Sequence, residues 1–140
     1  MEVKFTVPGK PTGKGRPRFN RKTGKTYTPK GTAAYERVVQ RAYLATAPDV
    51  HLTGPIRAKI SACYGIPMSW PNKKIEAALA GHIFPTVKPD LDNVAKAVLD
   101  ALNGIAYDDD SSIVQLIICK SYAYPPCVIV TLEEMEEGLQ

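Results

Sequence analysis

Aspartates gather in two short segments of this 140-residue sequence. Asp90 and Asp92 stand at the start of a predicted helix, and the run Asp108 to Asp110 comes just before a hydrophobic segment. Adjacent carboxylates repel one another unless a cation neutralises them. Oxygen ligands without nearby His or Cys favour Mg²⁺ or Mn²⁺ over zinc. Taken together, the two segments predict a site for such an ion.

Each acidic segment also has an ordinary structural explanation, which the sequence leaves open. Asp90 can cap the helix, while Asp92 can stabilise its positive end and pair with Lys96 one turn later. The three adjacent aspartates can form a solvated turn. Their spacing does not match a calcium-binding EF-hand loop. His51 and His82 stand alone and are expected on the surface.

Basic residues are concentrated at the start of the chain. Residues 1–41 hold 11 Lys and Arg against 2 Glu, whereas residues 88–140 hold 3 against 10 Asp and Glu. Residues 9–30 are rich in Gly, Pro, Lys and Arg, so we expect a basic N-terminal loop or arm there. If this arm clamps phosphates, its candidate contacts are Lys10, Lys14, Arg16, Arg18, Arg21 and Lys22. Phe19 and Tyr27 could stack on bases, although a merely solvated loop is the alternative.

Periodicity predicts the elements that would position these residues. Strands are predicted near residues 3–7, 56–64, 113–122 and 127–132, the last two forming a C-terminal β-hairpin. Helices are predicted from Thr32 to just before Pro48, at 69–80, and from Asp90 to residue 102, with Thr32 and Asp90 as caps. This order favours one α+β domain over residues 1–140, a two-layer α/β sandwich whose mixed sheet carries helices on one face.

Composition and cysteine usage narrow the class of protein. Hydrophobic residues make up 44% and charged residues 23%, as in globular domains. No apolar stretch approaches the roughly 20 residues of a membrane helix, and no signal peptide is apparent, so a soluble, cytoplasmic protein is expected. The three cysteines form no C-x-x-C pair, which favours reduced, buried thiols over disulfides or zinc. No nucleotide-binding motif is present, so no nucleotide cofactor is expected.

Several stretches of the sequence resemble the RusA-type Holliday junction resolvases, also called crossover junction endodeoxyribonucleases. The stretches are Pro89-Asp90-Leu91-Asp92-Asn93-Val94-Ala95-Lys96-Ala97, Leu99-Asp100-Ala101-Leu102-Asn103-Gly104 and Tyr107-Asp108-Asp109-Asp110-Ser111-Ser112-Ile113-Val114. The opening segments Val7-Pro8-Gly9-Lys10-Pro11 and Lys14-Gly15-Arg16-Pro17-Arg18 also resemble the N-terminal region of the family. The chain departs from the pattern at Tyr107, where many members have Trp, and at Ser112, where many have Gln.

The resemblance implies a Mg²⁺-dependent, homodimeric nuclease, often prophage-encoded. Such an enzyme resolves Holliday (four-way) junctions by paired, symmetric nicks in DNA recombination and repair. The family's essential, metal-binding aspartates fall on Asp90, Asp92 and Asp110, and its catalytic lysine falls on Lys96. Asp109 is the alternative third ligand, and Mn²⁺ is a candidate substitute for Mg²⁺. A less specific branched-DNA or flap nuclease and a catalytically silent junction-binding protein stay open as alternatives.

Overall fold

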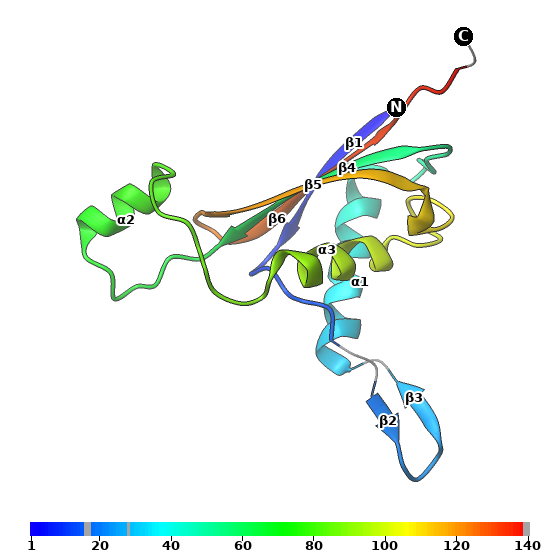
Figure 1. The fold of residues 1–140 in the computed structure, drawn as a ribbon, viewed down its shortest axis with the longest axis horizontal. Coiled ribbons are helices and arrows are strands. Elements are labelled where there is room, and N and C mark those ends of the chain that lie inside the picture. The colour runs from blue at the N-terminus through cyan, green and yellow to red at the C-terminus, as the bar shows by residue number, and fades with distance from the viewer. Residues whose placement is uncertain (16–17, 28, 139–140) are drawn as a thin grey trace.

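The computed structural model describes residues 1–15, 18–27 and 29–138. Its main element is a four-stranded sheet with the strand order β1-β6-β4-β5 (Figure 1). The strands are β1 (Glu2–Pro8), β4 (Ile56–Tyr64), β5 (Ile113–Tyr122) and β6 (Cys127–Glu134). β6 is antiparallel to β1 and β4, whereas β5 is parallel to β4. The predicted α+β fold with a mixed sheet is therefore confirmed.

The predicted C-terminal hairpin is wrong, although both of its strands are present. β4 lies between β5 and β6 and hydrogen-bonds to each of them. The short connection between β5 and β6 crosses the end of β4, where the Ala123 N–H donates to the Tyr64 carbonyl oxygen at 3.0 Å. A short linker between two β-rich runs suggests that the two strands pair directly. Instead, the buried β4 lies between β5 and β6 and forms backbone hydrogen bonds with both.

Two helices cover one face of the sheet. α1 (Lys30–Thr46) and α3 (Leu91–Ala101) lie side by side under the strands, while the short α2 (Asn72–Leu79) lies beyond one end of the sheet (Figure 1). The two-layer arrangement with helices on one face is as predicted. Thr32 does not cap α1, because the helix begins two residues earlier. Its side chain is buried, and its hydroxyl accepts a hydrogen bond from the Gly15 N–H at 2.9 Å.

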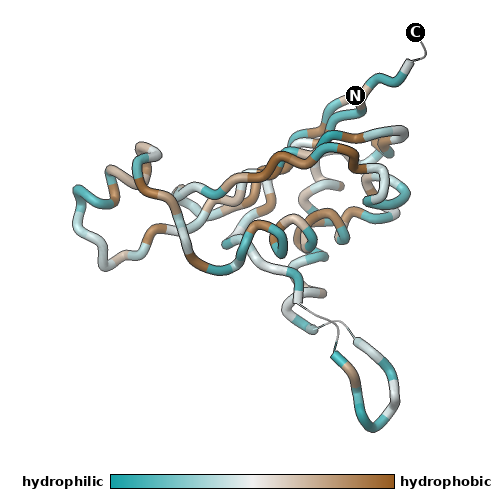
Figure 2. Tube along the Cα trace, in the orientation of Figure 1, coloured by the Kyte–Doolittle hydropathy of each residue, from teal (hydrophilic) through white to brown (hydrophobic). Residues whose placement is uncertain are grey.

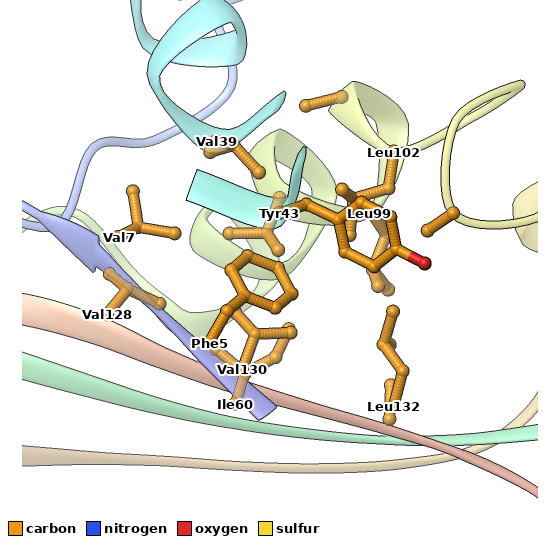
Figure 3. Close-up of a cluster of buried hydrophobic side chains, with 14 of the residues drawn as sticks. Phe5, Val7, Val39, Tyr43, Ile60, Leu99, Leu102, Val128, Val130 and Leu132 are labelled. Carbon is orange, nitrogen blue, oxygen red and sulfur yellow. The ribbon is translucent and has the colours of Figure 1, made fainter. Parts of the chain in front are cut away.

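The hydrophobic core lies between the sheet and these two helices (Figure 3). Phe5 of β1 and Tyr43 of α1 meet edge to face, with ring centroids 5.5 Å apart. α3 contributes a fully apolar side, formed by Val94, Ala95, Ala97, Val98, Leu99 and Ala101. Burying each large side chain contributes roughly 1.5–3 kcal/mol, so this side anchors the helix firmly. The polar side of α3 is thereby held at a fixed place on the molecule.

The basic arm contains a small antiparallel hairpin, which the sequence did not indicate. β2 (Arg18–Asn20) pairs with β3 (Lys25–Tyr27), and the hairpin extends away from the two-layer body (Figure 1). Figure 2 shows that the arm is mostly hydrophilic, in contrast to the hydrophobic strands of the main sheet. Because both of its strands are short and exposed, neither has the alternating apolar pattern from which strands are predicted.

The cysteines differ in burial, so the prediction of three buried thiols is wrong in part. Cys63 is buried and Cys127 half-buried, whereas Cys119 is exposed because it lies on β5, at the edge of the sheet. All three are free thiols.

Within the described ranges, no helix has the length and apolar character needed to cross a membrane.

Candidate functional site

Asp90 and Asp92 lie at the start of α3, as predicted. Asp90 is the residue before the helix, in an extended conformation, but its carboxylate does not cap the helix backbone. Instead, its Oδ1 accepts a hydrogen bond from the Asn93 side chain at 2.7 Å. Asp92 is exposed in the first turn, where the positive end of the helix dipole stabilises an anion. Both carboxylates are therefore open to a ligand.

Two adjoining hollows lead away from the start of α3. A hollow of about 510 Å³ is lined by Asp90, Asn93, Lys88 and Pro89. A second, of about 580 Å³, shares Lys88 and Pro89 and continues past Lys10. The Tyr64 hydroxyl donates to the Pro89 carbonyl oxygen and so ties the segment before Asp90 to the end of β4. The hollows thus combine one carboxylate with two lysines.

The polar side of α3 carries Asp92, Lys96 and Asp100, which are spaced four residues apart. Residues at this spacing lie on one face of a helix. Lys96 Nζ lies 3.3 Å from Asp100 Oδ2, so its carboxylate partner follows it in the chain and is not Asp92. Sequence reasoning did not select Asp100 as a site residue, although its spacing from Lys96 was a signal for this pair.

Asp110 lies beside Asp100, in the 3₁₀ turn η1 (Asp110–Ser112) that leads into β5. Its backbone N–H donates to Asn103 Oδ1 at 2.9 Å. Burial raises the pKa of the Asp110 carboxyl above its ordinary value, and the negative charges of Asp100 and Asp109 raise it further. A hydrogen bond to Asp100 acts on this pKa in the same direction, while the Lys96 cation opposes the shift. A bound cation would therefore be favoured here.

The neighbouring aspartates have other partners. Asp109 Oδ2 accepts from the Ser111 N–H at 3.0 Å and caps η1, and bonds from Ser111 lower the pKa of this carboxyl. Asp108 is exposed, and its Oδ1 lies 2.8 Å from His51 Nε2. His51 is itself exposed, as is His82, so the prediction that both lie on the surface is confirmed.

The predicted ligands are not gathered into one ready-made ion site. Across the described ranges, no three side chains of Asp, Glu, His or Cys lie close enough to hold an ion by themselves. Asp92 and Asp100 are eight residues apart, which is about 12 Å along a helix. Asp90 and Asp92 thus lie at one end of α3, and Asp110 lies beside Asp100 at the other. A carboxylate-only donor set still suits Mg²⁺, which proteins commonly bind with one or two carboxylates plus water and substrate phosphate.

The predicted phosphate contacts fall into three groups. Lys10 lines the larger hollow, and Arg18, Arg21 and Lys22 are exposed on the arm. Lys14 instead points inward, where its Nζ contacts two carboxylates. Arg16 lies outside the described residues. The structure thus leaves four of the six predicted contacts accessible and shows a fifth already paired.

Known proteins resemble this chain over most of its length. The family model of Endodeoxyribonuclease RusA matches residues 8–133. The uncharacterized protein YqaN of Bacillus subtilis (strain 168) is 37% identical over 137 residues, which cover 95% of this chain and 96% of that protein. The region matched by the family model includes the arm, both acidic segments and Lys96.

Proposed function

We propose that this chain, which belongs to the RusA family of endodeoxyribonucleases, resolves Holliday (four-way) DNA junctions in recombination and repair. It would do so by hydrolysing one phosphodiester in each of two opposed strands. The observation that carries the proposal is the family match across both acidic segments and the arm. The family makes the chain an endodeoxyribonuclease; the junction substrate and the paired, symmetric cuts are our proposal.

Hydrolysis is proposed to depend on Mg²⁺, with Mn²⁺ as a substitute. Asp90 and Asp92 at one end of α3, and Asp110 near its other end, would supply the carboxylate ligands, and water and the substrate phosphate would complete the coordination. When bound, Mg²⁺ supplies a Lewis acid and a water of lowered pKa. Two features support the choice of ligands: the open carboxylates at the start of α3, and the raised pKa of Asp110 among like charges. Asp109 is the weaker candidate for the third ligand because its carboxylate already caps η1.

Lys96 is proposed to stabilise the negative charge that develops on the phosphate oxygens. Its side chain is 61% exposed, so the ammonium group can reach a substrate on the outer side of α3. Its ion pair with Asp100 keeps the ammonium group near Asp110 before DNA binds. Hydrolysis would leave a 5′-phosphate and a 3′-hydroxyl.

DNA contacts outside the site would come from the arm and from Lys10. Arg18, Arg21 and Lys22 are exposed cations that can bind backbone phosphates without reading sequence. Phe19 and Tyr27, which are 61% and 49% exposed, can stack on unpaired bases at a branch point. The active form is proposed to be a homodimer with C2 symmetry, because two strands must be cut and each chain supplies one such site.

A cleavage assay on three DNA substrates tests the proposed function. The wild-type chain is incubated with a synthetic four-way junction, a flap substrate and linear duplex, with Mg²⁺, with Mn²⁺ or with EDTA. We expect paired, symmetric nicks in the four-way junction alone, and none in EDTA. Equal cutting of the flap or the duplex would indicate a less specific nuclease. Tight junction binding without cutting under any condition would indicate a catalytically silent binding protein.

A further inference from the structure

Residues 13–15 of the arm, between β1 and the β2–β3 hairpin, are seated directly on the two helices. The Lys14 N–H donates to the Asn93 carbonyl oxygen of α3 at 3.0 Å, and the Gly15 N–H donates to Thr32 Oγ1 of α1 at 2.9 Å. A Cβ atom at Gly13 would lie 3.1–3.2 Å from the Cβ atoms of Pro89 and Asn93. The segment 13–15 therefore has a fixed position on the body of the molecule, unlike the exposed β2–β3 hairpin of the arm.

The Lys14 side chain is enclosed in this seat. Its Nζ lies 2.5 Å from Glu36 Oε1 on α1 and 3.4 Å from Asp100 Oδ2 on α3. The three side chains are only 19–23% exposed. Burial alone would lower the pKa of the Lys14 ammonium, but the hydrogen bonds and charges of Glu36 and Asp100 outweigh it and raise the pKa. Lys14 is therefore a charged group that joins both helices.

Asp100 connects this ion pair to the candidate site. The same Oδ2 that contacts Lys14 lies 3.3 Å from Lys96 Nζ, and the Asp100 carboxylate lies beside Asp110. The position of the Lys96 ammonium group thus depends on where the Asp100 carboxylate is held, and Asp110 lies next to the same carboxylate. Lys14 and Lys96 contact the same carboxylate oxygen, and Lys14 is the less exposed of the two lysines.

A DNA phosphate would have to compete with two carboxylates for Lys14. Moving the ammonium group to a phosphate would leave Glu36 and Asp100 as partly buried, uncompensated charges, and removing one partner of a buried ion pair is strongly destabilising. The arm cations Arg18, Arg21 and Lys22 carry no such cost, because they are exposed. The position of Lys14 in a basic stretch of sequence therefore does not indicate its role.

We infer that Lys14 is a positioning residue for the reaction: it fixes the Asp100 carboxylate, which in turn places the Lys96 ammonium group beside Asp110, and it makes no contact with DNA phosphate. This inference rests on the proposed function. It assigns a role to an ion-pair network that links the root of the arm, α1 and α3 to the reacting groups.

The test compares three lysine variants on the four-way junction. Lys14→Met removes the charge and keeps the aliphatic stem. Lys22→Met removes an exposed arm cation, and Lys59→Met removes an exposed lysine on the opposite face of the sheet. For each we measure single-turnover cleavage at saturating junction, junction affinity in EDTA at several salt concentrations, and circular dichroism.

For Lys14→Met we expect cleavage at saturating junction to fall on the order of tenfold to a hundredfold, because a misplacement of about 1 Å can have such an effect. Its affinity and the slope of log affinity against log salt should match the wild type. Lys22→Met should weaken binding and reduce that slope by about 0.9. Lys59→Met should change neither quantity. Lys14→Arg, which keeps a cation able to bridge two carboxylates, should restore cleavage to within about threefold of wild type.

Two outcomes would overturn the inference while the wild type still cuts junctions. One is a slope reduced by about 0.9 in Lys14→Met with unchanged saturating cleavage, which would make Lys14 a phosphate contact. The other is a loss of cleavage in Lys14→Arg as large as in Lys14→Met. If Lys14→Met does not fold, Lys14→Gln carries the same expectations. A wild type that cuts no branched substrate would refute the proposed function instead.

Discussion

The three adjacent aspartates Asp108, Asp109 and Asp110 lie in three different environments. Asp108 pairs with an exposed histidine, and Asp109 caps a turn. Asp110 lies partly buried against Asp100, and Lys96 offsets part of the repulsion. A metal ligand needs both a fixed position and a charge that the protein leaves uncompensated. By these criteria Asp110 is the best candidate among the three for the third ligand.

We predict that Asp110→Asn abolishes cleavage of the four-way junction while junction binding persists. Losing a metal ligand should remove several kcal/mol of transition-state stabilisation. Asp109→Asn should have an intermediate effect, because it weakens the cap of the turn η1 and so loosens the position of Asp110. Asp108→Asn should stay within a few-fold of wild type because its carboxylate is solvated. Single-turnover cleavage and gel-shift binding of the three variants measure these effects.

Thermal unfolding in EDTA is the control for this series. Since the pKa of Asp110 is raised on folding, the folded chain binds this proton more tightly than the unfolded chain does. The resulting stabilisation is present at low pH and is lost as the pH rises through the folded-state pKa. At neutral pH Asp110→Asn should therefore be as stable as wild type or slightly more stable. Full activity in Asp110→Asn beside an inactive Asp109→Asn would move the ligand one residue back.

Sequence patterns identified some of the site residues and missed others for a physical reason. Asp90 and Asp92 were selected because they stand at the start of a helix, which is a local feature of the sequence. Lys14, in the segment after β1, meets Asp100 of α3, which is far away in the chain. Their ion pair depends on how α1 and α3 pack, and no local pattern records that. Lys14 was therefore grouped with the other cations of the arm.

At the scale of elements, α3 was the best predicted and the β5–β6 connection the worst. The helix was predictable because its apolar residues recur at helical spacing and form the side that the core buries. Strand positions were also predictable, but strand order was not, since alternation shows which face is buried and not which neighbour pairs. The parallel pairing of β4 with β5 joins two segments that are far apart in the chain, so the alternation within each strand does not predict it.

The arm is the element whose charge should determine DNA affinity. We predict that changing Arg18, Arg21 and Lys22 together to Ala weakens junction binding and flattens its salt dependence. Each phosphate contact that is removed should take about 0.9 from the log-log slope. Fluorescence anisotropy with labelled junction in EDTA, across a range of salt concentrations, measures both quantities.

A control variant tests whether the effect depends on where the cations lie. Lys4→Ala with Lys59→Ala removes two cations from the face of the sheet opposite the helices, and its slope should change much less. Wild-type affinity and slope in the arm variant would mean that the arm is a solvated loop. The sequence groups Arg16 with the arm cations, so Arg16→Ala alone should reduce the slope by about 0.9, the effect of a single phosphate contact.

At the scale of the whole molecule, the described helices α1 and α3 cover one face of the sheet, and β5 forms one of its edges. Among the described strands, β5 pairs along one edge, with β4. Val114, Leu116 and Ile117 on β5 are 61%, 43% and 47% exposed. Edge strands of soluble proteins usually carry charges or proline that block pairing. The apolar edge of β5 is therefore our candidate surface for the proposed dimer.

We predict that Leu116→Lys with Ile117→Lys converts the dimer to a monomer. The two changes place like charges on both faces of the edge that two copies would share, and like charges opposite each other destabilise strand pairing. Light scattering at micromolar concentration measures the oligomeric state. A plasmid that extrudes a cruciform measures its consequence: paired cuts by a dimer yield linear DNA, whereas independent cuts by monomers accumulate nicked circles first.

The double variant Leu44→Lys with Leu79→Lys is the matched control, because it adds the same charge at exposed leucines on α1 and α2. It should remain a dimer and yield linear product. A wild-type chain that is monomeric at micromolar concentration, with cleavage first order in protein, would contradict the dimer itself. A β5 variant that stays dimeric would instead place the interface on another surface.

β5 begins directly after η1, the turn that carries Asp110. A dimer interface along β5 would therefore link the position of Asp110 in one subunit to contacts with the other subunit. Cutting by the two subunits would then be coupled through the fold.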